Sequence, residues 1–374
     1  MTLRNCDPIV NRIFSNAPCR LAAALIWAWA VLNASSAAAG TDFPALNGDR
    51  DAAVLKIYSS LDEDVSEPLI AAFQRRFQSI AVQYHDLQSL EIYERVIDET
   101  DTRSATADLV ISSAMDLQVK LANDGYAQPV QLTTPAGWPD WAVWRRTAFG
   151  LTFEPAVIVY HKPTFEKLDL PTNRAKLMDL LAHEDEPLYG KIATYDIERA
   201  GLGFLFMARD IEHNRDIWRL IARLGGAGVR LYSSSSAILE RVADGRFALG
   251  YNILGSYARN WADRNPDLGI ILPEDYTVVM SRIALVPQAA GNVNLGRQFL
   301  AFLMSEAGQQ IMAREAKLPV LHPNVPGANT LAAMQNEVGN RLRPIPIGPG
   351  LVAYLDQVKR ARLIKRWNET LRGN

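Results

Sequence analysis

Hydroxyl side chains recur where β-rich runs of this chain give way to helical ones. Ser59 and Ser60 follow one such run, Ser112 and Ser113 follow a second, and four serines at 233–236 follow a third. Serine hydroxyls and the free N–H groups at a helix start are donors suited to an anion. Alternatively, each serine is an N-cap that satisfies only its own helix. Three such loops in one chain favour a shared anion-binding cleft.

A fourth loop carries charge as well as donors. Thr194 ends another β-rich run, and residues 200–203 then lead into a helix that starts at Gly203. Arg199 precedes that helix, and its guanidinium suits a phosphate or carboxylate. Arg282 is a second candidate of the same kind. Alternatively, each arginine forms an ion pair on the surface or between parts of the fold.

These loops need a framework that brings them together. Short β-rich runs alternate with amphipathic stretches, which is typical of a parallel α/β sheet. The predicted strands are 54–58, 81–85, 108–111, 157–160, 191–194, 229–232, 248–251, 269–272 and 283–286. The predicted helices cover 65–77, 114–121, 203–209, 238–242, 295–303, 330–342 and 351–371. Ligands of open α/β sheets lie beyond the carboxyl ends of the strands, where the serine loops stand.

The first 39 residues indicate export. Three arginines precede an apolar run at 21–32, and Ala37 and Ala39 form an A-x-A ending before Gly40. A positively charged N-terminal region, a short apolar core and small residues before the cleavage site are typical of a cleavable secretory signal peptide. The alternative, an uncleaved anchor, needs about 20 apolar residues.

The remaining 335 residues contain no cysteine, because Cys6 and Cys19 both lie in the leader. Losing the leader changes the net charge from −2 to about −4, which favours neither nucleic acid nor a membrane surface as partner. The length favours two domains. The five histidines show no metal-ligand spacing, and no carboxylate pair is singled out for acid–base chemistry. We therefore predict no catalytic residue, metal or cofactor.

Several segments in a fixed order resemble a known family. They are LKIYSSLDEDVSEPLIAAFQRRF, ADLVISSAMDLQVKLANDGYAQP, FGLTFEPAVIVYHKP, GKIATYDIERAGLGFLF, GYNILGSYARN and ILPEDYTVVMSRIALVP. They span most of residues 53–320. The chain resembles the periplasmic solute-binding proteins of ABC importers. The similar branch contains ferric-iron-binding, hexose-phosphate-binding and phosphoglycerate-transport regulatory proteins.

The resemblance implies an α/β fold of the periplasmic binding protein type II, with two doubly wound lobes joined by hinge strands. Residues 1–39 form the signal peptide, 40–150 with 279–320 the first lobe, and 151–278 with 321–374 the second. The chain would cross between the lobes at 150–154 and return at 276–281. The implied function is periplasmic capture of a small molecule and delivery to an ABC permease in the inner membrane, without enzymatic chemistry.

The expected ligand follows from how this chain departs from the iron-binding relatives. Those proteins hold ferric iron with two adjacent tyrosines and, in many cases, a histidine and a glutamate. Here the corresponding segment, GYNILG at 250–255, has one tyrosine, and serine loops stand where the histidine and glutamate are expected. Hydroxyls and helix N-termini without metal ligands favour a small anionic, phosphorylated organic solute.

The resemblance and the loops together suggest a set of ligand contacts. Tyr195, Tyr251 and Asn252 would contact the organic part, and Glu154 and Asp196 would accept hydrogen bonds from hydroxyl groups. The full candidate set is Ser59, Ser60, Ser112, Ser113, Glu154, Thr194, Tyr195, Asp196, Arg199, Gly201, Ser234, Ser235, Tyr251, Asn252, Tyr276, Ser281 and Arg282.

Other interpretations remain open. The same scaffold could bind ferric iron with a synergistic anion, present its ligand to a membrane histidine kinase, or act as an exported enzyme. The basic helix at 351–371 is expected to pack on a lobe with a solvated face, although docking onto a permease is an alternative.

Overall fold

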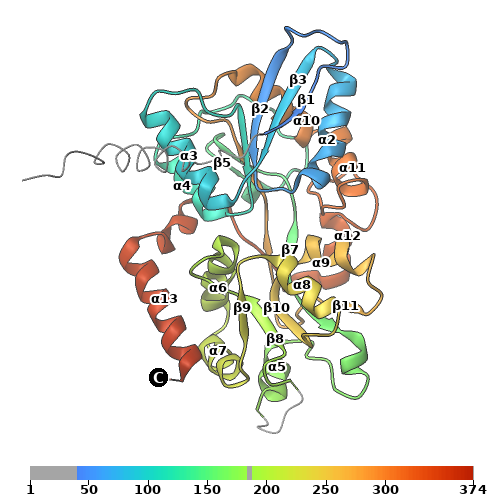
Figure 1. Cartoon of the computed structure of the whole chain (residues 1–374), viewed down its shortest axis with the longest axis vertical. Coiled ribbons are helices and arrows are strands. Elements are labelled where there is room, and N and C mark those ends of the chain that lie inside the picture. The colour runs from blue at the N-terminus through green and yellow to red at the C-terminus, as the bar shows by residue number, and fades with distance from the viewer. Residues whose placement is uncertain (1–39, 183–187, 374) are drawn as a thin grey trace, which may run out of the picture. The chain divides into compact units, whose positions relative to one another are not determined.

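The computed structural model describes residues 40–182 and 188–373 (Figure 1). The signal peptide predicted at 1–39 lies outside these residues. Within the described ranges, no helix combines the length and the apolar character that crossing a bilayer requires.

The first sheet, sheet 1, has a parallel centre and antiparallel edges. Strand β2 pairs in parallel with β3 and β4, whereas β13 runs antiparallel to β4 and β6. The expectation of a parallel sheet therefore holds for the centre alone, because β13 returns from the other sheet in the opposite direction. In spatial order the strands are β1 (Thr41–Phe43), β3 (Ile80–Asp86), β2 (Ala53–Ser59), β4 (Leu109–Ser112), β13 (Ile283–Leu285), β6 (Ala148–Gly150) and β5 (Val143–Trp144).

Helices pack on sheet 1 through apolar stripes. In α2, Leu69, Ile70 and Phe73 are buried at helical spacing, and Phe73 meets the ring of Phe299 edge-on at 4.9 Å. The helices of this part are α2 (Glu63–Arg76), α3 (Ser89–Asp101), α4 (Met115–Asn123), α10 (Val293–Met304) and α11 (Glu306–Arg314), with the short 3-10 helix η1 (Asp140–Ala142).

The second sheet, sheet 2, is also mixed. Strands β10, β8 and β9 run parallel, and β7 is antiparallel to β10, β11 and β12. Its order is β14 (Leu342–Pro344), β12 (Thr277–Met280), β7 (Glu154–His161), β10 (Leu249–Leu254), β8 (Ile192–Tyr195) and β9 (Arg230–Tyr232), and β11 (Leu268–Ile271) pairs with β7.

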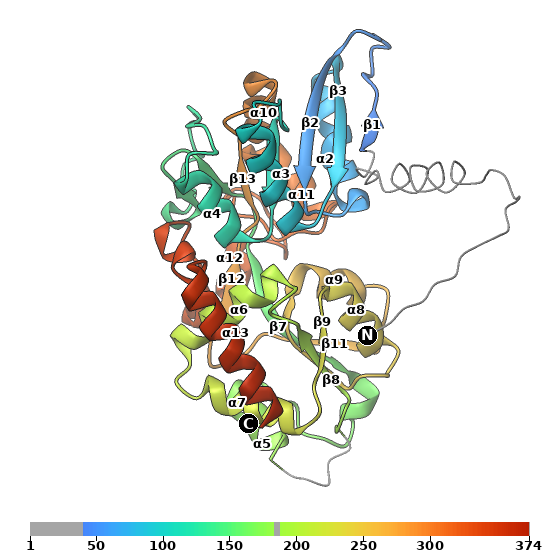
Figure 2. The same cartoon turned by 60° about the vertical axis from the view of Figure 1, so that its left-hand side comes forward.

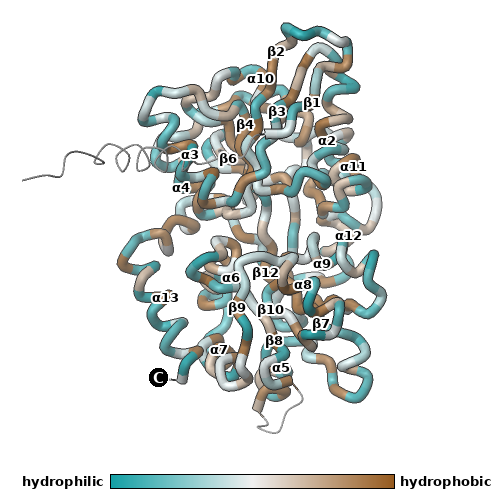
Figure 3. The backbone as a smooth tube through the Cα atoms, in the orientation of Figure 1, coloured by the Kyte–Doolittle hydropathy of each residue, from teal (hydrophilic) through white to brown (hydrophobic). Residues whose placement is uncertain are grey.

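The other seven helices and three 3-10 turns of the described residues lie around sheet 2 or in the C-terminal stretch. Figure 2 shows α13 running alongside α6 and α7. The elements are η2 (Lys162–Phe165), α5 (Arg174–Leu180), α6 (Gly201–His213), α7 (Ile217–Gly226), α8 (Ser235–Ala243), α9 (Gly255–Ala262), α12 (Leu331–Val338), η3 (Gly339–Arg341), η4 (Pro349–Tyr354) and α13 (Gln357–Arg372). Hydrophobic residues concentrate along the strands, whereas α13 is largely hydrophilic (Figure 3).

Two short segments connect the sheets side by side. Residues 151–153 lead from β6 to β7, and Ser281 and Arg282 lead from β12 to β13. The Leu151 N–H donates to the Arg282 carbonyl at 2.9 Å, and the Arg282 N–H donates to Thr152 Oγ1 at 2.8 Å. Because the boundary expected at residue 279 falls inside β12, we propose that the return crossing lies at 281–282, two residues further on.

The stretch from 321 to the C-terminus does not stay with one sheet. Leu321, Val325 and Val338 are buried with residues of sheet 1, whereas β14 pairs with β12 of sheet 2. We propose that this stretch belongs to both lobes and not to the second lobe alone.

A buried charged centre stabilises the sheet-2 part. Asp210 of α6 is 0% exposed and accepts a hydrogen bond from Arg174 Nη2 at 3.1 Å. It also accepts hydrogen bonds from Tyr251 Oη at 2.8 Å, Tyr276 Oη at 2.7 Å and Asn252 Nδ2 at 2.6 Å. Burial disfavours the charge of Arg174, but the Asp210 carboxylate holds its pKa well above the usual value. These contacts join α5, α6, β10 and the residue that precedes β12.

We expect Asp210→Asn to lower the free energy of unfolding by about 3 kcal/mol or more, because it leaves the Arg174 charge buried with less compensation. Urea denaturation measures this change. Asp216→Asn is the matched control, since Asp216 pairs with Arg219 on the surface and should change stability by less than about 0.5 kcal/mol. Equal effects of the two substitutions would contradict the role given to Asp210.

Candidate ligand-binding pocket

A pocket of about 430 Å³ lies where loops of both sheets meet. Ser60, Leu87 and Ser113 line it just after β2, β3 and β4. From sheet 2, residues 198–202 follow β8 and residues 233–236 follow β9. The loops at the carboxyl ends of both parallel strand sets thus share one cavity, the usual ligand position in α/β sheets.

Eight of the seventeen sequence candidates line this pocket. They are Ser60, Ser113, Tyr195, Arg199, Gly201, Ser234, Ser235 and Arg282. The other nine are Ser59, Ser112, Glu154, Thr194, Asp196, Tyr251, Asn252, Tyr276 and Ser281, which do not line it.

Hydrogen bonds to nearby backbone N–H groups explain why three of these nine residues do not line the pocket. Ser59 Oγ accepts from the Leu61 N–H at 3.1 Å, and Ser112 Oγ accepts from the Ala114 N–H at 3.2 Å. The Asp196 carboxylate accepts from the Glu198 N–H at 3.0 Å. For these three residues the structure matches the alternative in which a polar side chain satisfies its own turn.

Strand geometry explains why Thr194, Tyr251 and Asn252 do not line the pocket. Alternation along β8 turns Thr194 away from the pocket, and its hydroxyl donates to the Tyr251 carbonyl at 3.0 Å. A register shift between Gly250 and Ile253, with Asn252 at φ 60°, lets the successive residues Tyr251 and Asn252 both reach Asp210.

Tyr276 also donates to Asp210, Ser281 belongs to a crossing segment, and Glu154, the first residue of β7, accepts from Thr152 Oγ1. These residues therefore lie in supporting hydrogen-bond networks and do not line the pocket.

Two helix N-termini meet in the pocket. Helices α4 and α6 have Ala114 and Ala200 at their N-caps, and neither N-cap residue has a capping side chain. In the first turn of α4, the Leu117 N–H donates to Asp116 Oδ1 at 2.9 Å. A Cβ built on Gly201 would lie 3.8 Å from the Ala114 Cβ, so the two helix starts are close neighbours at the pocket. The first N–H groups of a helix have no partner within it and carry partial positive charge. This arrangement attracts an anion.

Arg282 places a permanent cation in the pocket lining. It is 2% exposed, and its Nε donates to Glu154 Oε1 at 3.0 Å. Its Nη1 donates to the Ser60 carbonyl at 3.2 Å. Burial opposes the charge, but Glu154 holds the pKa of Arg282 above its usual value. Arg199, in contrast, has an 81% exposed side chain 3.8 Å from Asp196.

The rest of the lining suits an organic body with hydroxyl groups. Tyr93, Leu117 and Tyr257 give it ring and aliphatic surface. Asp62 and Asp86 add hydrogen-bond acceptors, and Asp62 accepts from Tyr257 Oη at 2.8 Å. Burial raises the pKa of Tyr195 to about 12, so its hydroxyl, 2.6 Å from Ser235 Oγ, keeps its proton.

Sequence reasoning missed several lining residues. Asp116, Tyr257, Leu355 and Arg360 belong to no local motif, and the last two come from the C-terminal stretch. The basic residues at 351–371 gave the one available sequence signal for Leu355 and Arg360, and that signal predicted a helix whose basic face is exposed to solvent.

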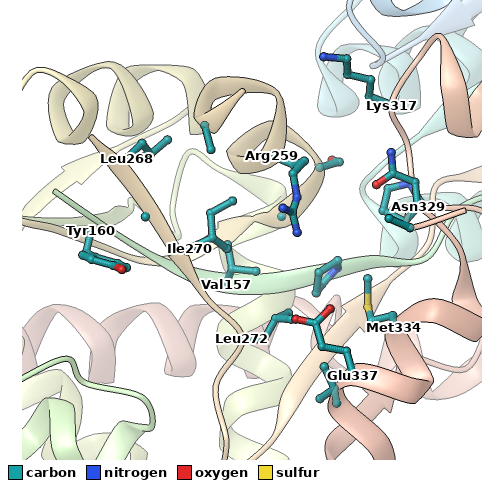
Figure 4. Close-up of a pocket in the computed structure, with 18 of the residues that line it drawn as sticks. Val157, Tyr160, Arg259, Leu268, Ile270, Leu272, Lys317, Asn329, Met334 and Glu337 are labelled. Atoms are coloured by element: carbon teal, nitrogen blue, oxygen red, sulfur yellow. The ribbon is translucent and has the colours of Figure 1, made fainter. Parts of the chain in front are cut away.

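A second cavity of about 560 Å³ has a different character (Figure 4). Apolar residues of β7 and β11, such as Val157 and Ile270, form its floor, and Arg259, Lys317 and Glu337 stand around it. It shares no lining residue with the smaller pocket and contains none of the strand-end loops of sheet 1. The smaller pocket is therefore the candidate ligand site.

No group of three or more histidine, cysteine or carboxylate side chains among residues 40–182 and 188–373 is arranged to hold a metal ion. The carboxylates in the pocket instead hydrogen bond to protein groups, as Asp62 does to Tyr257.

Asp116 should make stability depend on pH. Burial raises the pKa of its carboxyl from 3.8 to about 6. Between these values the folded protein holds a proton that the unfolded chain lacks, so the contribution of this group to stability falls as the pH rises from 4 to 6.

We expect Asp116→Asn to match the wild type near pH 4 and to exceed its unfolding free energy by up to about 3 kcal/mol at pH 8. Chemical denaturation across this range measures the difference. Asp124→Asn, an exposed change at the C-cap of the same helix, should show no such gain, and a pH-independent difference for Asp116→Asn would contradict the assignment.

Comparison with known proteins agrees with this geometry. Residues 55–315 match the family model described as bacterial extracellular solute-binding protein. The crystal structure of the substrate-binding protein of an ABC transporter from Agrobacterium tumefaciens is 59% identical, with a TM-score of 0.84 over 89% of this chain and 98% of that one. A search of curated protein sequences found no significant match.

More distant structures share the fold. AfuA from Actinobacillus pleuropneumoniae, with fructose-6-phosphate bound, is 15% identical, with a TM-score of 0.70 over 85% of this chain and 98% of that one. Iron-bound HitA from Pseudomonas aeruginosa is 16% identical, with a TM-score of 0.67 over 85% and 99%. The expected type II periplasmic binding protein fold, two α/β lobes joined by crossing strands, is confirmed. The chain belongs to the family of bacterial extracellular solute-binding proteins and is a substrate-binding component of an ABC transporter.

Proposed function

We propose that this protein captures a small anionic organic solute, specifically a phosphorylated one, in the periplasm and delivers it to an ABC permease in the inner membrane. The observation that carries the proposal is that the starts of α4 and α6, whose N-cap residues have no capping side chain, lie close together at a pocket that Arg282 lines. Partial positive charges that lie close together repel, and an anion bound beside them relieves that repulsion.

The size of the pocket supports an organic ligand. A volume of about 430 Å³ falls in the range of about 300–1,000 Å³ usual for small-molecule sites. Tyr93 and Tyr257 offer surface to a carbon skeleton, and Asp62 and Asp86 can accept from its hydroxyl groups. A sugar phosphate or a phosphorylated organic acid has all of these features.

The relatives are compatible with this ligand class. AfuA binds fructose-6-phosphate on the same fold, and HitA binds iron on it. For this chain an organic phosphate is favoured over iron, because the segment at 250–255 has one tyrosine where the iron-binding relatives have an adjacent pair.

Native mass spectrometry of protein purified from its own periplasm tests the proposal, because tightly bound solutes copurify. We expect the mass of an organic phosphate, released on denaturation. A bound ferric ion or an uncharged solute would contradict the proposed ligand class.

Gly201→Asp should weaken ligand binding without lowering stability. The new carboxylate would occupy the free N-terminus of α6, where it favours the helix but repels an anion. We expect affinity for fructose 6-phosphate, measured by calorimetry, to fall by about 100-fold, with no loss of unfolding temperature. Gly201→Asn, the uncharged control of the same shape, should lose far less, and equal losses would contradict an anion at this position.

A hydrogen bond between the lobes should influence closure. Tyr257 Oη of α9 donates to Asp62 Oδ1 next to α2, and removing it should favour more open forms of the ligand-free protein. We expect Tyr257→Phe to increase the radius of gyration measured by small-angle X-ray scattering. Tyr126→Phe is the matched control, because its hydroxyl bonds Asp101 within the first lobe, and identical curves for the two variants would count against this role.

A further inference from the structure

The C-terminal stretch packs on both lobes beside the pocket. β14 pairs with β12 of sheet 2, η4 then packs against α4 of sheet 1, and α13 returns to pack on α7. Leu351 of η4 is 2% exposed in a cluster with residues of both sheets. This stretch lies beyond residue 315, where the match to the family model ends.

Helix α13 is held firmly on α7. Leu363 and Trp367 are buried between them, and the Arg366 guanidinium lies 4.0 Å from the centre of the Trp218 ring. A Cβ at Gly225 would lie 2.2 Å from the Leu371 carbonyl oxygen, so the two helices are in backbone contact. The first turn of α13 therefore has a defined position beside α6.

That position brings Arg360 to the N-terminus of α6. Its side chain lines the pocket, its guanidinium lies 5.2 Å from the centre of the Phe204 ring, and Nη2 donates to the Glu198 carbonyl at 3.4 Å. Asn368 of the same helix donates to the Glu198 side chain. Arg360 is thus tied to the loop that opens α6, while Arg199, the residue expected there, is 81% exposed.

The guanidinium retains capacity for a ligand. Of its five N–H donors, one is used within residues 40–182 and 188–373, in the bond to Glu198. Asp116 of α4 also lines the pocket, and the Arg360 charge favours the ionised form of its carboxyl. Arg360 therefore adds positive charge and unused donors to the pocket lining beside the first turn of α6.

We propose that Arg360 directly contacts the anionic group of the ligand, and that residues 349–360 form a pocket wall that selects ligands by charge. This inference rests on the proposed function. A planar guanidinium binds a phosphate through two parallel hydrogen bonds, which adds to the donors of the two helix N-termini. The C-terminal stretch is then part of the binding site and not simply a helix packed on the outside.

Titration calorimetry of the full mature protein tests this, with inorganic phosphate, glycerol 3-phosphate and fructose 6-phosphate as probes. We expect Arg360→Gln to weaken the phosphorylated probes by about 10- to 100-fold, and Arg360→Lys to recover part of the loss. Arg362→Gln removes the same charge from an exposed position on the same helix and should weaken them by less than about 2-fold.

If Arg360 only supported the fold, replacing it would lower the unfolding temperature even without ligand. We expect the unfolding temperature of the ligand-free Arg360→Gln variant to stay within about 2 °C of the wild type. A large drop without recovery by lysine would overturn the contact. Equal affinities of Arg360→Gln and Arg362→Gln would overturn it and leave the proposed function standing, whereas a wild type that binds none of the phosphorylated probes would overturn both.

Discussion

A buried ion pair joins the two strands that pass between the lobes. Arg282 and Glu154 are 2% and 0% exposed, with Nε and Oε1 3.0 Å apart. Removing two charges from water is costly, and the loss of either partner would leave the other uncompensated. Thr152 and Ser256 complete the hydrogen bonding of Glu154. Since Arg282 also lines the pocket, the crossing strands and the ligand site depend on the same cation.

A second buried charged group, the Asp210 centre, stabilises the second lobe. It holds Tyr276, the residue before β12, against α5 and α6. The return strand therefore starts from a rigid base, and we expect any rotation of the lobes to bend the short segments 151–153 and 281–282 together with the C-terminal stretch that packs on both lobes. The same network holds the side chains of Tyr251 and Asn252, which do not line the pocket, whereas the carboxyl end of β10 borders the pocket at Leu254.

The local pattern predicted much of the framework but not its edges. Strands such as β2 and β7 and helices such as α2 and α6 are apolar or periodic enough to be recognised alone. Helix α3 was missed because it buries few residues, and β5, β6 and β14 were missed because they are two or three residues long. Such short strands form through pairing with partners distant in sequence. The start of α13 at Gln357, six residues later than expected, reflects the separate turn of η4 on α4.

The resemblance carried by six segments of the sequence indicated the family and, with it, the two-lobed α/β fold. The sequence also located the loops that surround the pocket, because strand ends and helix starts are local features that hydroxyl residues mark. Tertiary structure decided which side chains of those loops face the cavity. Ser113 lines it and Ser112 does not, because successive residues leave a strand in opposite directions. Tertiary packing also brought Arg360 to the start of α6, about 160 residues away in the chain, because burying Leu363 and Trp367 on α7 fixes the position of α13.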